Sequence, residues 1–80
     1  MDDQALTKKL GATIRHLRHR KQESQESFAI LCGLHRTYIG AIERGEKNVT
    51  VVTAKRISDA LGLTLTQLFA EVECEAIFDE

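Results

Sequence analysis

The chain of 80 residues contains no proline and no tryptophan, and its aromatic residues are three phenylalanines and one tyrosine. A core of this composition must be built from leucine, isoleucine, valine and alanine packed between helices. The absence of proline also suits a helical chain, because proline breaks helix interiors. No apolar run approaches the ~20 residues that cross a bilayer, so no segment is predicted to span a membrane.

Cysteine is also scarce. Cys32 and Cys74 lie far apart, with neither zinc-site spacing nor a disulfide framework. Cys32 lies on an apolar helical pattern and is predicted to be a core thiol, whereas Cys74 lies among glutamates and is predicted to be exposed and unreactive. The N-terminal sequence MDDQALTKK lacks the apolar segment of a signal peptide. We therefore expect a soluble, cytoplasmic protein.

Catalytic motifs are missing as well. The sequence has no evident nucleophile–base pair and no phosphate-binding loop, so we predict that the protein is not an enzyme, with no cofactor and no small-molecule substrate. His16 and His19 lie three residues apart among arginines, where solvent or DNA phosphates are more natural neighbours than a metal ion. We predict no metal site.

The net charge of -1 hides an asymmetry. Residues 1–47 hold nine Lys/Arg against six Asp/Glu, whereas residues 48–80 hold two against six. A basic front and an acidic back favour a nucleic-acid partner for the first part of the chain. The tail, about residues 73–80, is predicted to face away from DNA.

Apolar residues recur at helical spacing in five segments, over about residues 5–21, 25–32, 36–44, 51–61 and 65–72. Ser24, Thr50 and Thr64 are suited to cap three of them. The side chains predicted to face inward from the first four segments are Leu6, Leu10, Ile14, Leu17, Phe28, Ala29, Leu31, Cys32, Ile39, Ile42, Val51, Ala54, Ile57 and Leu61. The predicted fold class is all-α, a compact five-helix bundle forming a single domain over residues 1–80.

The stretch from Gln25 to Gly45 is the most informative part of the sequence. Two short helical patterns flank Gly33, at which a positive φ ends the first helix. Ala29, four residues earlier, is small enough to let two helices cross closely. This spacing predicts a helix-turn-helix over about residues 25–44, a unit that lays its second helix in the major groove of DNA.

The second helix of this motif has two distinct sides. At 100° per residue, Ile39 and Ile42 fall together and are predicted to be buried. The opposite side is basic, polar and small, as entry into a groove requires, and Arg36 could form two hydrogen bonds with a guanine. The residues predicted to contact bases are Arg36, Thr37, Tyr38, Gly40 and Ala41.

Four segments carry a family resemblance: SQESFA at 24–29, GLHRTYI at 33–39, IERG at 42–45 and DALGLTLTQLF at 59–69. Together they resemble the Xre family of Cro and phage-repressor helix-turn-helix regulators, with the lambda-repressor-like fold. The run GLHRTYIGAIERGEKN further resembles the controller proteins of restriction–modification systems. The resemblance implies a sequence-specific transcriptional regulator.

The resemblance also implies residue roles. Arg18 and Glu43 match a pair that joins the first helix to the third by a partly buried ion pair. The positions that match, or lie near, contacts with DNA phosphates are Gln25, His35, Arg44, Lys47 and Asn48.

One recognition helix covers only a few base pairs, so specific binding usually needs two copies on a palindrome. We therefore expect a homodimer on double-stranded operator DNA, acting by occluding or touching RNA polymerase. The last helix is the predicted interface, through Leu65, Leu68, Phe69 and Val72, joined by Ile77 and Phe78. The same side chains could instead close the core of the monomer, which Leu65 and Leu68 are expected to do in part. The alternative is an antitoxin-type or anti-regulator module that uses the same fold to hold a partner protein.

Overall fold

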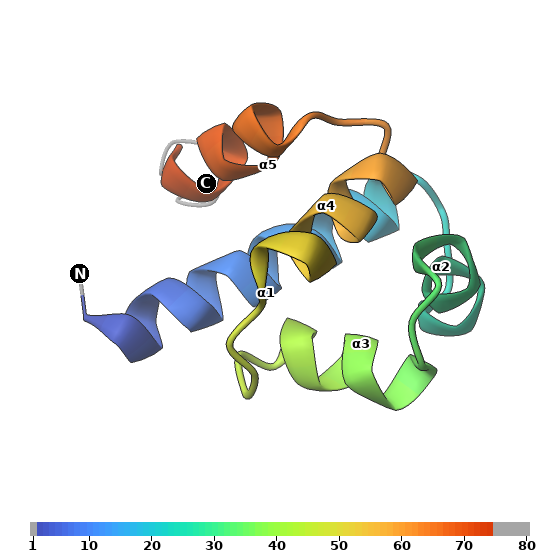
Figure 1. The fold of residues 1–80 in the computed structure, drawn as a ribbon, viewed down its shortest axis with the longest axis horizontal. Helices are drawn as coiled ribbons and strands as arrows, with labels where there is room; N and C mark the ends of the chain where they lie inside the picture. The colour runs from blue at the N-terminus through green and yellow to red at the C-terminus, as the bar shows by residue number, and fades with distance from the viewer. Residues whose placement is uncertain (1, 75–80) are drawn as a thin grey trace.

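A computed structural model describes residues 2–74, which form five helices and no strand (Figure 1). These are α1 (Asp3–Arg20), α2 (Gln25–Cys32), α3 (Arg36–Glu43), α4 (Val51–Ala60) and α5 (Leu65–Glu73). The all-α prediction is confirmed, and the predicted helix limits agree to within two residues. No helix in residues 2–74 is long and apolar enough to cross a membrane.

The helix starts follow the predicted caps. Ser24 accepts from the Ser27 backbone N–H, and the Ser27 hydroxyl oxygen in turn accepts from the Ser24 N–H, so two otherwise unpaired donors are satisfied. Thr64 and Gln67 form the same reciprocal pair at the start of α5, whereas at the start of α4 the Thr50 side chain accepts from the Thr53 backbone N–H. These local bonds fix where each helix begins, and hence the angle at which it enters the bundle.

The turn between α2 and α3 depends on Gly33. Its φ of 69° and ψ of 33° lie in the left-handed region, where a side chain is strained. The Leu34 N–H donates to the Ala29 carbonyl at 2.9 Å, closing the end of α2. The chain then turns at once into α3, as a helix-turn-helix requires.

The core lies where all five helices meet. It is formed by Leu10, Ile14, Leu17, Phe28, Ala29, Cys32, Ile39, Ile42, Ile57, Leu61, Leu68 and Val72. Cys32 is buried in it, as predicted, and Cys74 is exposed. Three residues predicted to face inward are instead exposed, namely Leu6, Leu31 and Val51. Leu6 and Val51 lie near the N-terminal ends of their helices, where fewer neighbouring helices cover them.

α1 and α3 approach each other closely at Gly11. A Cβ added at Gly11 would overlap the Ile42 carbonyl oxygen and lie 2.8 Å from that of Glu43. These are backbone atoms that cannot rotate away, so only glycine fits at this crossing. Figure 1 shows α1 running between α3 on one side and α5 on the other.

The predicted interface on α5 was wrong for two of its residues. Leu68 and Val72 are 0% and 1% exposed, because α5 packs this face against α1 and α4 within the monomer. Leu65 is half-buried and Phe69 is 39% exposed, so only these two can contribute to a contact outside the monomer. Ile77 and Phe78, predicted to join that interface, lie outside the described residues.

Candidate nucleic-acid interface

The N-terminal end of α3 presents polar side chains to solvent. Arg36 and Thr37 are both exposed there. His35 caps the helix: its Nδ1 accepts from the Thr37 backbone N–H at 3.2 Å and lies 2.7 Å from the Thr37 hydroxyl oxygen. The two exposed residues therefore lie on the first turn of a firmly capped helix.

The middle of α3 is more buried than its sequence pattern predicted. Ile39 and Ile42 are in the core, as expected, at 0% and 1% exposed. Ala41 was predicted to lie on the exposed side, but it is only 7% exposed. The chain turns back at this end of α3, where the Glu46 N–H donates to the Ala41 carbonyl at 2.9 Å. The predicted exposed position of Ala41 was therefore wrong.

Gly40 is also buried, beneath two polar side chains. A Cβ added there would lie 3.1 Å from Arg44 Nη1 and 3.7 Å from Gln25 Oε1. The open backbone approach predicted at Gly40 is therefore occupied by side chains from α2 and from the end of α3. Tyr38 is half-buried and packs against the core, which leaves only part of it accessible.

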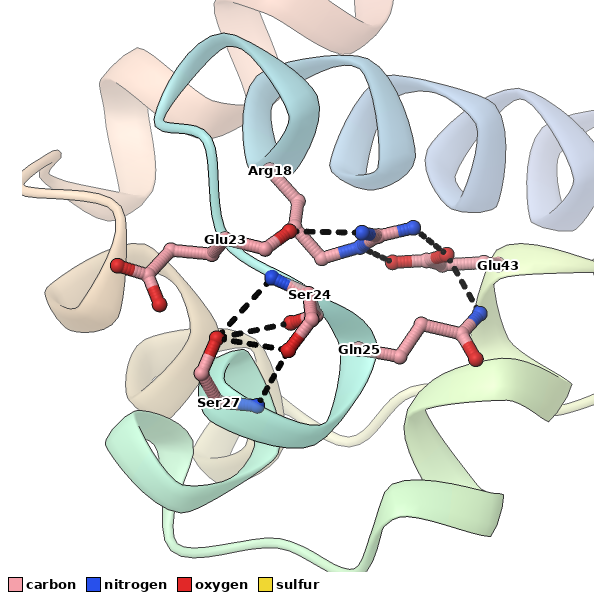
Figure 2. A network of polar contacts seen from close by, with 6 residues as sticks. All are labelled: Arg18, Glu23, Ser24, Gln25, Ser27 and Glu43. Carbon is pink, nitrogen blue, oxygen red and sulfur yellow. Dashed lines mark hydrogen bonds and ion pairs between the residues drawn. The ribbon is translucent and has the colours of Figure 1, made fainter.

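A buried ion pair lies between α1 and the C-terminal end of α3 (Figure 2). Arg18 donates from Nε and Nη2 to the two carboxylate oxygens of Glu43 at 2.7 and 2.9 Å. Their side chains are 7% and 2% exposed, and Arg18 Nη1 also donates to the Glu23 carbonyl at 2.8 Å. The Arg18–Glu43 pair implied by the resemblance is present, and it neutralises the acidic residue of α3.

Gln25 extends this network from the start of α2. Its amide Nε2 donates to Glu43 Oε1 at 3.0 Å, as Figure 2 shows. An amide nitrogen carries two hydrogens, so the other remains available to a further acceptor. The network thus ties together α1, α2 and α3, the three helices that form the candidate interface.

Beyond the end of α3, Arg44 pairs with Glu46. Its Nε and Nη2 donate to the two Glu46 carboxylate oxygens at 2.9 and 3.1 Å, with both residues exposed. The hydrogen bond from Arg44 lowers the pKa of Glu46 below its usual range. Lys47 and Asn48 follow in the exposed loop, and Asn48 accepts a hydrogen bond from the Thr7 hydroxyl of α1 at 3.4 Å.

Comparison with known proteins agrees with this geometry. Residues 9–70 match the model of a family described as "Helix-turn-helix domain". The control protein C.MunI of a Mycoplasma species is 44% identical over 68 residues, which are 84% of this chain and 92% of that protein.

Two solved structures are similar over most of the chain. The restriction–modification controller protein C.AhdI of Aeromonas hydrophila superposes with a TM-score of 0.76 at 42% identity, covering 81% of this chain and 97% of that one. The wild-type controller protein C.Esp1396I gives a TM-score of 0.81 at 30% identity over 90% and 92% of the two chains. This chain belongs to the family of helix-turn-helix controller proteins. The relatives named here are regulatory proteins and not enzymes.

In this controller protein, sequence reasoning missed two polar contacts of the interface. The bond from Gln25 to Glu43 could not be foreseen from residues 18 positions apart. The Arg44–Glu46 pair has a local signal, opposite charges two residues apart, from which it could have been predicted. Arg15, His16 and His19 line a shallow hollow together with Glu43, so the basic side of α1 adjoins the C-terminal end of α3. Within residues 2–74, no group of three or more metal-binding side chains lies together.

Proposed function

We propose that this controller protein binds a palindromic operator in double-stranded DNA as a homodimer and regulates transcription from it. The observation that carries the proposal is the composition of α3. Its first turn exposes Arg36 and Thr37, while its acidic residue, Glu43, is buried and neutralised by Arg18. Residues at this end of the second helix of the motif contact base edges in the major groove.

Arg36 and Thr37 are the proposed base-contacting residues, with Tyr38 at the margin. Arg36 has the two parallel donors that match O6 and N7 of guanine. The residues proposed to contact phosphates are Gln25, His35, Arg44, Lys47 and Asn48. Gly40 and Ala41 are not among the proposed base contacts, because both residues are buried.

An exposed apolar surface supports the homodimer. Two hollows meet at Val49 and Phe69 and extend to Leu6 on one side and to Val51 and Leu65 on the other. We call these five residues the Phe69 surface. Leu6 is 48% exposed and Val51 75%, so the surface offers apolar area that a second copy would cover.

Sedimentation of Phe69→Glu tests the dimer. We expect the wild type to sediment as a dimer and the variant as a folded monomer, because the new charge would be buried in the interface. Ile30→Glu is the matched control, since Ile30 is also an exposed apolar residue but lies on α2, outside the Phe69 surface. Equal dimerisation of both variants would contradict the assignment.

Selection from a random-sequence DNA pool tests operator binding. We expect a palindrome whose half-sites lie about one helical turn apart. Arg36→Ala should lose roughly 1–3 kcal/mol of binding free energy at the selected guanine and little on random DNA. Failure to enrich any palindrome, together with co-purification of a partner protein, would favour the protein-interaction alternative.

The relatives are named control proteins, and two of their kind are described as restriction–modification controllers. We propose the same role for this protein, in the cytoplasm, where it would act by blocking or contacting RNA polymerase. Transcription in vitro from a promoter carrying the selected operator, with purified polymerase, measures whether the protein activates or represses. No change in transcript level at saturating protein would rule out this role.

A further inference from the structure

The contact between His35 and Thr37 caps the start of α3 and also determines where the hydrogens of both side chains lie. A backbone N–H can only donate, so the bond from the Thr37 N–H requires an unprotonated lone pair on His35 Nδ1. The Thr37 hydroxyl oxygen lies 2.7 Å from the same Nδ1. An unprotonated Nδ1 has no hydrogen to give, so the hydroxyl donates its own and shares the lone pair with the more distant Thr37 N–H.

The single hydrogen of the Thr37 hydroxyl is therefore directed at His35. What remains on the outer side of the oxygen is lone pairs, which only accept. Thr37 is exposed on the first turn of α3, so this oxygen can meet a base edge as an acceptor but not as a donor.

We propose that His35 is a positioning residue that makes Thr37 select a base with an exocyclic amino group in the major groove. Adenine presents N6–H₂ and cytosine N4–H₂ there, whereas guanine and thymine present the acceptors O6 and O4 at the equivalent places. A threonine hydroxyl that rotates freely can bind either kind of base, because it can act as donor or as acceptor. The inference rests on the proposed function, because it assumes that Thr37 faces DNA.

The ring of His35 has a second consequence. With Nδ1 unprotonated, the neutral imidazole carries its hydrogen on Nε2, on the other side of the ring. That N–H can donate to a DNA phosphate, which is the contact proposed for His35. One side chain would then orient a base-contacting residue and bind the backbone beside it.

Competition binding with sequencing measures the preference at each operator position. We expect one position per half-site where wild type prefers adenine or cytosine over guanine or thymine by roughly three- to tenfold, the size of one neutral hydrogen bond. Thr37→Val, which keeps the shape but lacks the hydroxyl, should reduce this ratio to about one at that position alone.

His35→Asn and His35→Gln form the decisive pair. The asparagine side-chain oxygen takes the place of Nδ1 and can accept from Thr37, so this variant should keep the preference. Glutamine places its polar atoms near Nε2, so the Thr37 hydroxyl is released and the ratio should fall to about one. Because each ratio compares two DNA sequences bound by one variant, any loss of folded protein cancels from it.

A role in capping alone would leave the base ratio unchanged in His35→Gln, and that result would overturn the inference. A wild-type preference for thymine at the Thr37 position would also overturn it, since it would indicate contact through the methyl group. Nitrogen NMR of the free protein adds a DNA-independent test: a hydrogen on Nδ1 would contradict the proposal even if operator binding is found. Loss of all palindrome selection would instead refute the proposed function.

Discussion

Two ion pairs at the end of α3 have similar geometry and different surroundings. Arg18–Glu43 and Arg44–Glu46 each contain an Nε-to-carboxylate contact, at 2.7 and 2.9 Å. The side chains of the first pair are 7% and 2% exposed, and those of the second are 61% and 55% exposed. Glu43 therefore points into the bundle, whereas the next residue, Arg44, points out to solvent.

Burial, rather than the distance between the charges, determines how much such a pair contributes to stability. A buried charge that loses its partner is left without water, so breaking the inner pair should be costly. An exposed pair contributes little to stability because water and salt compete with it. The inner pair thus holds the helices together, while the outer pair can open without disturbing the fold, which would free Arg44 for the proposed phosphate contact.

The largest effect is expected from breaking the inner pair. Arg18→Met leaves Glu43 buried without its main partner, so we expect a loss of about 3–5 kcal/mol in the free energy of unfolding, measured with urea. The double variant with Glu43→Leu should recover most of the loss, because no buried charge remains. A loss below about 1 kcal/mol in the single variant would mean that the pair behaves as an exposed one.

The approach of α1 to α3 that shields the inner pair can be tested at Gly11. Gly11→Ala forces a methyl group against two backbone carbonyls, so we expect a loss of about 1–3 kcal/mol in the free energy of unfolding, measured by thermal denaturation. Gly40→Ala is the matched control, since its new methyl group meets only the ends of flexible side chains. The control should be neutral, or more stable by up to ~1 kcal/mol from helix propensity. Equal losses would contradict the close crossing.

The outer pair should instead limit DNA binding. Glu46→Gln frees Arg44, so we expect tighter binding to random DNA and a steeper salt dependence, by about one phosphate contact. The stability of the fold should hardly change, because this pair is exposed to solvent. Glu73→Gln, which removes the same charge at an exposed position on α5, is the control and should bind as the wild type does. Identical behaviour of the two variants would place Arg44 away from DNA.

The smallest effect concerns the pKa of Glu46. The hydrogen bond from Arg44 depresses it, so the stabilisation from this pair is present above the unfolded-state pKa and is lost as the pH falls through the folded-state value. Arg44→Gln should raise the Glu46 pKa toward its ordinary value, as followed by NMR of the carboxyl carbon. Lys55→Gln, which breaks a separate pair with Asp59, should leave it unchanged.

The sequence predicted the fold well because its signals are local. Ser24, Thr50 and Thr64 cap helices through neighbours three residues away, and Gly33 ends α2 through its own backbone angles. The crossing at Gly11 was not predicted, since it depends on carbonyls of α3 more than 30 residues along the chain. The full burial of Leu68 and Val72 could not be predicted in the same way, because an apolar face does not say whether its partner is another helix or another copy.

The candidate site shows the same contrast. Features set by neighbouring residues were predicted, and those set by distant residues were not. The exposed positions of Arg36 and Thr37 and the burial of Ile39 follow from helical periodicity alone. Gly40 and Ala41 were misplaced, because a helical wheel omits the rest of the chain, such as the Gln25 and Arg44 side chains that lie over Gly40. The pairing of Arg18 with Glu43 came from family resemblance and could not be deduced from spacing.

The buried thiol of Cys32 can report how often α2 of the helix-turn-helix detaches from the bundle. Burial raises the pKa of its thiol to about 11, and the residue is 4% exposed at the last position of α2. In a Cys74→Ser background, an alkylating reagent should modify the protein only while α2 is detached from its neighbours. The labelling rate then measures how often α2 detaches from the bundle, and bound operator DNA should lower this rate.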